Sequence, residues 1–238
     1  MKAMIFSAGL GTRFKPWTDA HPKALAIVNG KSLLQRNIEY LQQYDITDIV
    51  VNVHHFADQV VDAINENKGW GSDISISDET EQVLETGGGL KKAEYLLTGK
   101  HSFLAINVDI LTDIDLDAMI SYHKKYQPVA SIAVSGRTTS RYFLFDGSYN
   151  LSGWRNIKTA EEKISRQQDN YLQKAFSGVH IIDPKIFSHI PSIEKISIVD
   201  IYLSLAVTET IKGFEHTGSK LVDVGRMESV PVAEALFN

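Results

Sequence analysis

Residues 2–23 read KAMIFSAGLGTRFKPWTDAHPK, an apolar stretch followed by a loop that contains two glycines, an arginine and a lysine. Residues 2–6 have the length and apolar character of a buried strand. Gly9 and Gly11 allow the backbone to come close to a ligand, and Arg13 and Lys23 can direct positive charge at a phosphate. The stretch therefore predicts an anion-binding loop at the carboxyl end of a first strand.

Two common phosphate-binding loops are excluded by the residues that follow the glycines. The dinucleotide fingerprint needs a glycine at position 14, which is Phe14, and a Walker A loop needs Gly-Lys-Ser/Thr where this chain has Gly-Thr-Arg. The second predicted strand also ends in Asn52-Val53-His54-His55, without the acidic residue that contacts a ribose. The residues alone leave open a tight turn whose arginine and lysine are merely solvated.

The rest of the chain alternates predicted strands and helices, and this pattern is typical of a mostly parallel sheet covered by helices on both faces. From Pro128 onward the predicted strands are short and joined by turn residues, which indicates an antiparallel insertion. Later in the chain, residues 197–212 read as an amphipathic helix and residues 220–225 as a strand. No repeat or linker marks a second domain, so residues 1–238 are predicted to form one domain.

Composition excludes several classes of function. With 43% hydrophobic residues and a net charge of -5, the chain can bury a core but has no basic excess for nucleic acid. It has no cysteine, which excludes thiolate catalysis and cysteine-based zinc sites and agrees with a reducing compartment. No stretch approaches the roughly 20 apolar residues of a membrane span. We expect a cytoplasmic protein, monomeric or homo-oligomeric, without nucleic-acid or membrane partners.

The first loop closely resembles the signature of the sugar-1-phosphate nucleotidyltransferases. The family pattern G-x-G-T-R-x-x-P-x-T, followed by P-K-P-L, is matched by AGLGTRFKPWT and HPKALAIVNGKSLLQ, with Ala24 in place of the second proline. This resemblance implies an α/β fold of the nucleotide-diphospho-sugar transferase type. That fold is a Rossmann-like three-layer sandwich with a mostly parallel sheet and a small antiparallel substrate-binding insertion. The chain shows none of the hexapeptide repeats of the C-terminal β-helix domain that some relatives carry.

The resemblance also assigns nucleotide contacts, in the first loop and in a second glycine-rich segment. LETGGGL, residues 84–90, is similar to the family's second nucleotide-binding segment, although the residues alone also allow a flexible helix start. The implied nucleotide-binding residues are Ala8, Gly9, Gly11, Thr12, Arg13, Lys23, Glu85, Gly87 and Gly88. Arg13, Lys23 and Asp109 are the implied catalytic residues.

Two aspartates are candidate metal ligands. Asp109 ends the apolar strand of AINVDILTD, where a carboxylate is costly to bury unless a cation meets it. The segment resembles the family's N-G-D metal motif, with Val108 in place of glycine and its side chain expected near the sugar phosphate. Asp223 in LVDVGRMES resembles the closing D-V-G segment, although it could instead cap a helix. The resemblance implies that both bind Mg²⁺, whereas Asp113 and Asp115 are better interpreted as a turn and a helix cap.

Sugar recognition is the least regular part of the resemblance. Many relatives carry Glu-Lys-Pro where this chain has GWRN, residues 153–156, and a plain hairpin with a packed Trp154 is an equally good interpretation. The segment FSGVHIID is similar to a family strand whose glycine, here Gly178, lets the sugar approach the main chain. The implied sugar-binding residues are Asn107, Arg155, Asn156 and Gly178.

The expected reaction transfers a nucleoside monophosphate from a nucleoside triphosphate to a sugar 1-phosphate, with release of pyrophosphate and dependence on Mg²⁺. The E-T-G-G-G segment resembles that of a subgroup of the family whose members use N-acetylmuramate 1-phosphate or mannose 1-phosphate. Within it, UTP and N-acetylmuramate 1-phosphate are the first expected substrates, and hence a role in making cell-wall or polysaccharide precursors. Mannose 1-phosphate with GTP, and glucose 1-phosphate with UTP or dTTP, are close alternatives. From a different class, an inactive regulator that binds nucleotide sugars is the remaining alternative, although such a protein could lose the metal carboxylates that this chain keeps.

Overall fold

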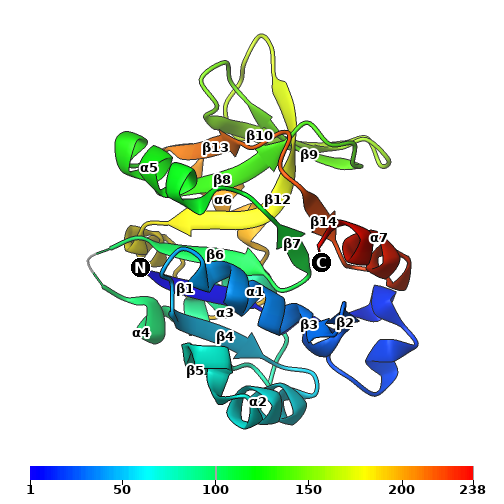
Figure 1. Cartoon of the computed structure of the whole chain (residues 1–238). Helices are drawn as coiled ribbons and strands as arrows, with labels where there is room; N and C mark the ends of the chain where they lie inside the picture. Colours follow the sequence, from blue (N-terminus) through cyan, green and yellow to red (C-terminus); the bar gives the residue numbers. More distant parts are fainter. Residues whose placement is uncertain (100, 238) are drawn as a thin grey trace.

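The computed structural model describes residues 1–99 and 101–237 of the chain; Asn238, the last residue of the predicted domain, lies outside the described residues. Strand β1 (Lys2–Phe6) runs through the middle of the main sheet and is parallel to both of its neighbours (Figure 1). Those neighbours and the edge strand beyond them complete the parallel half: β6 (Phe103–Asn107), β4 (Asp48–Val53) and β5 (Asp73–Asp78).

The second half of the sheet is antiparallel to the first where they meet. Strand β12 (Leu172–Ile182) pairs with β6, and the sheet follows the order β11-β10-β9-β12-β6-β1-β4-β5. Off this path, β8 pairs with β12, and β13 pairs with β8. The further strands are β8 (Ala130–Ser135), β9 (Arg141–Phe145), β10 (Leu151–Asn156), β11 (Glu161–Ile164) and β13 (Ile211–Glu215). The predicted mixed architecture, a parallel core with an antiparallel insertion, is therefore confirmed.

One predicted helix is only partly helical. The helix expected over residues 197–212 is the helix α6 (Ile198–Leu205), and β13 begins at Ile211, where it pairs in parallel with β8. Lys212 continues the amphipathic pattern of the helix in the sequence, but it lies in strand β13. Its ammonium group donates a 2.6 Å hydrogen bond to the carbonyl oxygen of Ser148. Pairing with β8 decides the conformation of these residues, against their helical spacing.

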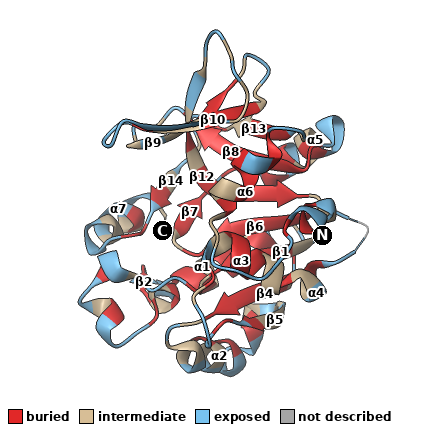
Figure 2. Cartoon of the chain, turned by 180° about the vertical axis from the view of Figure 1, so that it is seen from behind, coloured by how far each residue is buried: buried red, intermediate tan, exposed pale blue. Residues whose placement is uncertain are grey.

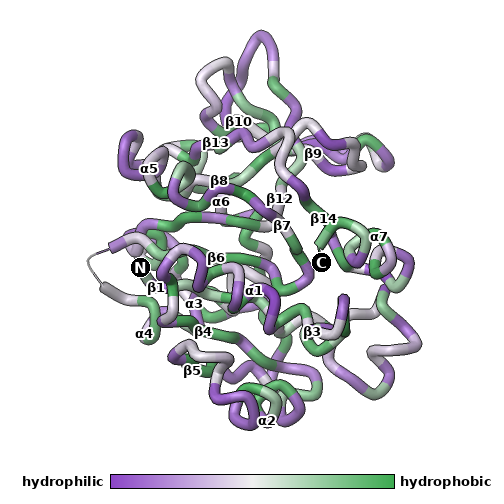
Figure 3. Tube along the Cα trace, viewed as in Figure 1, coloured by the Kyte–Doolittle hydropathy of each residue, from purple (hydrophilic) through white to green (hydrophobic). Residues whose placement is uncertain are grey.

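Helices cover both faces of the sheet, as the alternation of side chains along β1 requires. Ala3 and Ile5 belong to one hydrophobic cluster, and Met4 and Phe6 belong to the other. The first cluster includes side chains of α1 (Leu33–Gln42), α2 (Ala57–Glu66) and α5 (Leu116–Tyr126). The second includes side chains of α3 (Glu85–Lys92), α4 (Glu94–Leu97) and α6. Figure 2 shows the buried strands between more exposed helix surfaces, and Figure 3 shows the apolar residues concentrated along them.

Short elements complete the fold near the chain termini and the loops. Strand β7 (Ile110–Thr112) pairs antiparallel with β14 (Leu221–Asp223), and β2 (Ile27–Val28) pairs with β3 (Lys31–Ser32). The closing helix is α7 (Val230–Leu236). The short 3₁₀ segments are η1 (Thr12–Phe14), η2 (Trp17–Asp19), η3 (Lys23–Leu25), η4 (Lys68–Gly71), η5 (Pro184–His189) and η6 (Met227–Ser229).

The strand register brings polar residues together at one edge of the sheet. Phe6 is opposite both Asn107 and Asn52, and Asn52 is opposite Ser77, so the carboxyl ends of four parallel strands are aligned. In sheets of this type, ligands bind at that edge. Across the described part of the chain, every helix is too short or too polar to cross a lipid bilayer.

Candidate active site

The loop after β1 is attached to the neighbouring strand and held in a tight turn. The amide of Ser7 donates to the side-chain oxygen of Asn52 at 2.7 Å, and the Ser7 hydroxyl donates to the Asn52 carbonyl at 2.6 Å. Gly11 adopts a left-handed φ of 61°, and a β-carbon there would lie 2.8 Å from Cγ2 of Thr18. The Thr18 hydroxyl donates to the Gly11 carbonyl at 2.9 Å. The turn therefore requires glycine at position 11.

A cavity of about 450 Å³ opens between this loop and the carboxyl ends of the parallel strands; we call it the loop pocket. Predicted nucleotide-binding residues that line the loop pocket are Ala8, Gly9, Gly11, Thr12, Arg13, Lys23 and Glu85. Its remaining lining residues are Phe6, Leu10, Asn52, Glu79, Val83, Thr86, Asn107, Asp109, Lys195 and Gly225. The structure therefore brings residues from the first loop and the glycine-rich segment to one cavity.

A second cavity of about 290 Å³ lies beside the antiparallel insertion; we call it the insertion pocket. Its lining residues are Arg13, Asn107, Asp109, Ile110, Arg137, Thr139, Arg141, Phe143, Trp154, Phe176, Gly178, Val199 and Asp223. Arg13, Asn107 and Asp109 line both pockets. The two cavities therefore meet at these three residues, and molecules bound in the two pockets would approach one another there.

The candidate metal ligands, Asp109 and Asp223, meet in the fold at this junction. Asp109 precedes β7 and Asp223 ends β14, and the pairing of these strands places Asp223 opposite Ile110. The ammonium group of Lys23 donates to the carboxylate of Asp109 in an ion pair. Desolvation, and then the negative charge of Asp109, raise the pKa of the Asp223 carboxyl, although Lys23 and Arg13 act in the opposite sense. Two carboxylates are therefore held close together beside two cations.

These carboxylates fit a small divalent cation that shares its ligands with a substrate. The described residues contain no group of three or more histidine, aspartate or glutamate side chains that could hold a metal. Mg²⁺, however, is typically held by one or two carboxylates together with substrate phosphates. At Gly225 a β-carbon would lie 2.6 Å from Oδ1 of Asp223 and 3.1 Å from Nη2 of Arg13. The absence of a side chain at Gly225 therefore keeps this junction open.

Residues next to the two aspartates have structural roles. The side chain of Val108 is 3% exposed and packs in the core, and it lines neither pocket, so the expectation that it projects near the sugar phosphate is wrong. Asp115 caps α5 by accepting a 2.9 Å hydrogen bond from the amide of Ala118, as predicted. The helix-cap alternative for Asp223 is wrong, because Arg226 and Ser229 occupy the positions before η6 and α7.

Gly87 and Gly88 face protein and do not line the loop pocket. Their amides donate to the carbonyl oxygen of Ile196, at 2.9 and 3.2 Å. A β-carbon on Gly88 would lie 2.0 Å from the carbonyl oxygen of Glu194, and one on Gly87 would lie 2.5 Å from Ile201. The glycines therefore let the loop before α6 pack against the start of α3, and their contact with a nucleotide stays a prediction.

The predicted sugar-binding residues fall into two groups. Asn107 and Gly178 line the insertion pocket, and Gly178 has a left-handed φ of 72°. The Oδ1 atom of Asn107 is buried and has no hydrogen-bond partner among the described residues, so it is free to accept from a ligand. Arg155 instead pairs with Glu162, and the Asn156 side chain accepts a 3.0 Å bond from the amide of Lys158. These two residues lie outside both pockets, whereas Trp154 lines the insertion pocket.

Sequence reasoning missed several residues that line the pockets. In the loop pocket, Glu79 is 1% exposed, and its carboxylate accepts a 2.6 Å hydrogen bond from the side-chain Nδ2 of Asn52. Burial raises the pKa of the Glu79 carboxyl. Both residues lie at the carboxyl ends of parallel strands, and this position could have identified them. In the insertion pocket, the missed residues include Arg137, Thr139, Arg141 and Phe143. No motif identifies these four, because the topology alone brings them there.

Comparison with known proteins agrees with this geometry. The family described as "Nucleotidyl transferase" matches residues 2–234. The N-acetylmuramate alpha-1-phosphate uridylyltransferases of Neisseria meningitidis and Caulobacter vibrioides are 31% and 33% identical to this chain. The first match covers 99% of this chain and 98% of the relative, and the second covers 98% and 95%. The chain belongs to the nucleotidyl transferase family.

A solved structure shares the fold. The crystal structure of HddC from Yersinia pseudotuberculosis in complex with GMP-PN superposes with a TM-score of 0.78 at 21% identity. The superposition covers all of this chain and 99% of that one. The likeness confirms that the nucleotidyltransferase type of α/β fold, predicted from the first loop, extends over the whole chain.

Proposed function

We propose that this enzyme transfers the uridylyl group of UTP to N-acetylmuramate 1-phosphate and releases pyrophosphate. The observation that carries the proposal is the junction of the two pockets at Arg13, Asn107 and Asp109. A nucleotide in the loop pocket and a sugar phosphate in the insertion pocket would have their reacting groups at that junction. The choice of UTP and N-acetylmuramate 1-phosphate is supported by the names of the two relatives that match this chain along nearly its whole length.

The residues of the two pockets suit these substrates. In the proposed complex the triphosphate lies along the backbone of residues 8–13, where glycines permit close approach, with Arg13 and Lys23 beside it. The sugar lies in the insertion pocket, where the Asn107 amide oxygen lacks a partner and Trp154 and Phe176 supply aromatic surface. Glu85 lines the far side of the loop pocket and is our candidate contact for the base or ribose.

The reaction needs alignment and charge neutralisation but no protein nucleophile. An oxygen of the sugar phosphate attacks the α-phosphorus of UTP, a new phosphorus–oxygen bond forms, and the bond to the departing pyrophosphate breaks. Arg13 and Lys23 stabilise the negative charge that gathers on the transferred and leaving phosphates. Mg²⁺, held by Asp109 and Asp223 together with the substrate phosphates, would supply further neutralisation of that charge. The pocket walls hold the two substrates in reacting order, which lowers the entropic cost of their encounter.

We also propose where the product is used. A nucleotide sugar is an activated glycosyl donor, so the product would be consumed by glycosyl transfer in the synthesis of a cell-wall or polysaccharide precursor. The chain contains no cysteine, which suits the reducing cytoplasm as the site of the reaction.

The test is a matrix of nucleoside triphosphates against sugar 1-phosphates, with magnesium, in which released pyrophosphate is measured and the product mass is determined. We expect the highest kcat/KM with UTP and N-acetylmuramate 1-phosphate. Preference for GTP with mannose 1-phosphate, or for glucose 1-phosphate with UTP or dTTP, would replace the proposed substrates and keep the reaction. Binding of nucleotide sugars without pyrophosphate release from any pair would identify a regulator and contradict the enzyme.

A further inference from the structure

The insertion pocket contains positive charge in addition to the arginine at its junction with the loop pocket. Three arginines line it, Arg13, Arg137 and Arg141, and none of them lies within 4.0 Å of a carboxylate oxygen among the described residues. Arg13 stands at the junction with the loop pocket, where the phosphates would react. Arg137 lies in the loop that joins β8 to β9 and Arg141 begins β9, both on the sugar side of the pocket. In the proposed complex the sugar phosphate lies at the junction beside Arg13, so Arg137 and Arg141 are left to contact the sugar itself.

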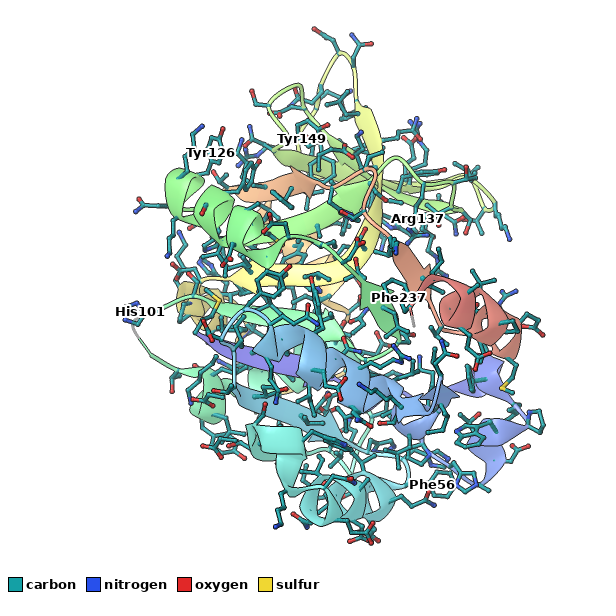
Figure 4. All side chains as sticks on the ribbon, in the orientation of Figure 1. Phe56, His101, Tyr126, Arg137, Tyr149 and Phe237 are labelled. Carbon is teal, nitrogen blue, oxygen red and sulfur yellow. The ribbon has the colours of Figure 1, made fainter. Side chains whose placement is uncertain are left out.

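Arg137 is held in place but has an unused donor. Its Nη2 donates a 2.8 Å hydrogen bond to the carbonyl oxygen of Phe176 in β12, which fixes the guanidinium beside the pocket. Its Nε atom is buried and has no hydrogen-bond partner among the described residues. A guanidinium offers five N–H donors in a planar fork that matches a carboxylate. Figure 4 shows Arg137 near β14, below the antiparallel strands.

The two aspartates of the pocket do not compensate these arginines. Asp109 is already paired with Lys23, and both Asp109 and Asp223 are the candidate ligands of the cation. Arg137 acts on Asp223 only as the last of the charges that influence the pKa of that carboxyl. A neutral hexose presents hydroxyl groups, which would leave the guanidinium charge uncompensated as the pocket closes over the ligand. An anionic substituent on the sugar would compensate the charge of the guanidinium.

We propose that Arg137, assisted by Arg141, binds a carboxylate carried by the sugar ring, so that the enzyme selects acidic sugar 1-phosphates. The inference rests on the proposed transfer reaction and adds to it the residue that recognises the sugar. Two sources of this carboxylate are the lactyl ether of N-acetylmuramate and the carboxyl group of a uronic acid. Paired substrates distinguish them, because N-acetylglucosamine 1-phosphate and glucose 1-phosphate are the corresponding sugars without the acid.

The experiment compares the wild type with the Arg137→Gln variant on both substrate pairs, and pyrophosphate release with UTP and magnesium is measured. We expect the wild type to favour the acidic member of one pair. In Arg137→Gln the ratio of kcat/KM for acidic over neutral sugar should fall on the order of 10²-fold, mainly through KM, because a charged hydrogen-bonded pair is lost. A smaller fall is expected in Arg141→Gln, because Arg141 is more exposed.

The matched control is Arg166→Gln. Arg166 also donates from Nη2 to a backbone carbonyl, that of Glu209 at 3.0 Å, but it lies outside both pockets. In Arg166→Gln, the ratio of kcat/KM for acidic over neutral sugar should equal that of the wild type. If Arg137→Gln proves unfolded by circular dichroism, two measurements still test the inference. They are the preference of the wild type for the acidic sugar 1-phosphate and the kcat/KM ratio of Arg141→Gln.

Three results separate the inference from the reaction on which it rests. Equal loss on acidic and neutral sugars in Arg137→Gln, or a wild-type preference for the neutral sugars, overturns the inference and leaves the transfer reaction standing. No pyrophosphate from any pair overturns the reaction. In that case calorimetric binding of N-acetylmuramate 1-phosphate against N-acetylglucosamine 1-phosphate still tests Arg137: tighter binding of the acid that is lost in the variant supports the role, and equal binding refutes it.

Discussion

The backbone amide of Val224 donates a hydrogen bond of 2.8 Å to the carbonyl oxygen of Asp109. This bond extends the pairing of β7 with β14 and joins two segments that are distant in the sequence. It places Asp223, the residue before Val224, close enough to Asp109 for the negative charge of Asp109 to raise the pKa of the Asp223 carboxyl. The two candidate metal ligands are therefore held near one another by main-chain hydrogen bonds.

Loss of either carboxylate should abolish most of the activity. We expect Asp109→Asn and Asp223→Asn each to lower kcat by at least ~10²-fold, comparable to the removal of one preorganised electrostatic group. The substitutions keep the shape of the side chain and remove its charge, so magnesium titrations should also shift to higher concentration. Asp115→Asn is the control, because asparagine also caps helices well and Asp115 lies outside both pockets. Full activity in either site variant would contradict the assignment.

Lys23 should be needed for turnover more than for binding. It pairs with Asp109 at the junction of the pockets, where its side chain is 14% exposed. We expect Lys23→Met to lower kcat by roughly 10²–10³-fold, because charge that develops on the leaving pyrophosphate would lose its cation. Lys31→Met is the control, since Lys31 is an exposed lysine paired with Glu39 and lies outside both pockets. Steady-state kinetics in which only KM rises would assign Lys23 to ground-state binding instead.

The first loop is the part of the site that local sequence predicts most directly, whereas Asp109 and Asp223 were identified only by their resemblance to family motifs. The first loop carries its glycines, Arg13 and Lys23 within one stretch, and that stretch lines the loop pocket. Arg155, by contrast, lies outside both pockets, because alternation along β10 turns it and its neighbour Trp154 to opposite faces and Arg155 pairs with Glu162 on the next strand. Its contact with a sugar stays a prediction.

The remaining site residues depend on contacts between distant segments. Glu79 and Asn52 meet only because β4 and β5 are parallel neighbours in register. Gly87 and Gly88 read as ligand contacts, yet the loop that approaches them belongs to residues 194–197, far along the chain. In the fold as a whole, the strand β13 was missed because its pairing with β8 is not encoded in the local spacing of residues 197–212.

Gly178 should tolerate no side chain. Its φ of 72° is left-handed, and a β-carbon would lie 2.7 Å from Cγ1 of Ile110 and 3.0 Å from Nδ2 of Asn107. We expect Gly178→Ala to lower the free energy of unfolding by about 1–3 kcal/mol and to raise KM for the sugar 1-phosphate, because Asn107 must move. Gly147→Ala is the control, since no atom would lie within 4 Å of its β-carbon. Urea denaturation and sugar kinetics check both effects, and an unchanged sugar KM would separate Asn107 from sugar binding.

His123 should make the fold sensitive to acid. It lies on α5, and its ring nitrogens are each 3.0 Å from a serine hydroxyl, Nδ1 from Ser131 and Nε2 from Ser102. Burial lowers its pKa from 6.5 to about 4. The unfolded chain therefore binds a proton below pH 6.5 that the folded chain rejects, so the stability that this histidine contributes is complete above that pH and is lost as the pH falls toward 4.

The measurement is urea denaturation of the wild type and His123→Gln at pH 7.5 and pH 5. At pH 5 the wild type should lose about 2 kcal/mol that the variant does not lose, since each unit below the unfolded pKa costs 1.36 kcal/mol. His180, whose pKa burial lowers to about 3, adds acid sensitivity of the same sign, but it is present in both proteins and cancels. Glu79, whose pKa burial raises, acts in the opposite sense and also cancels. Parallel stability profiles for the two proteins would show that the fold does not lower the pKa of His123.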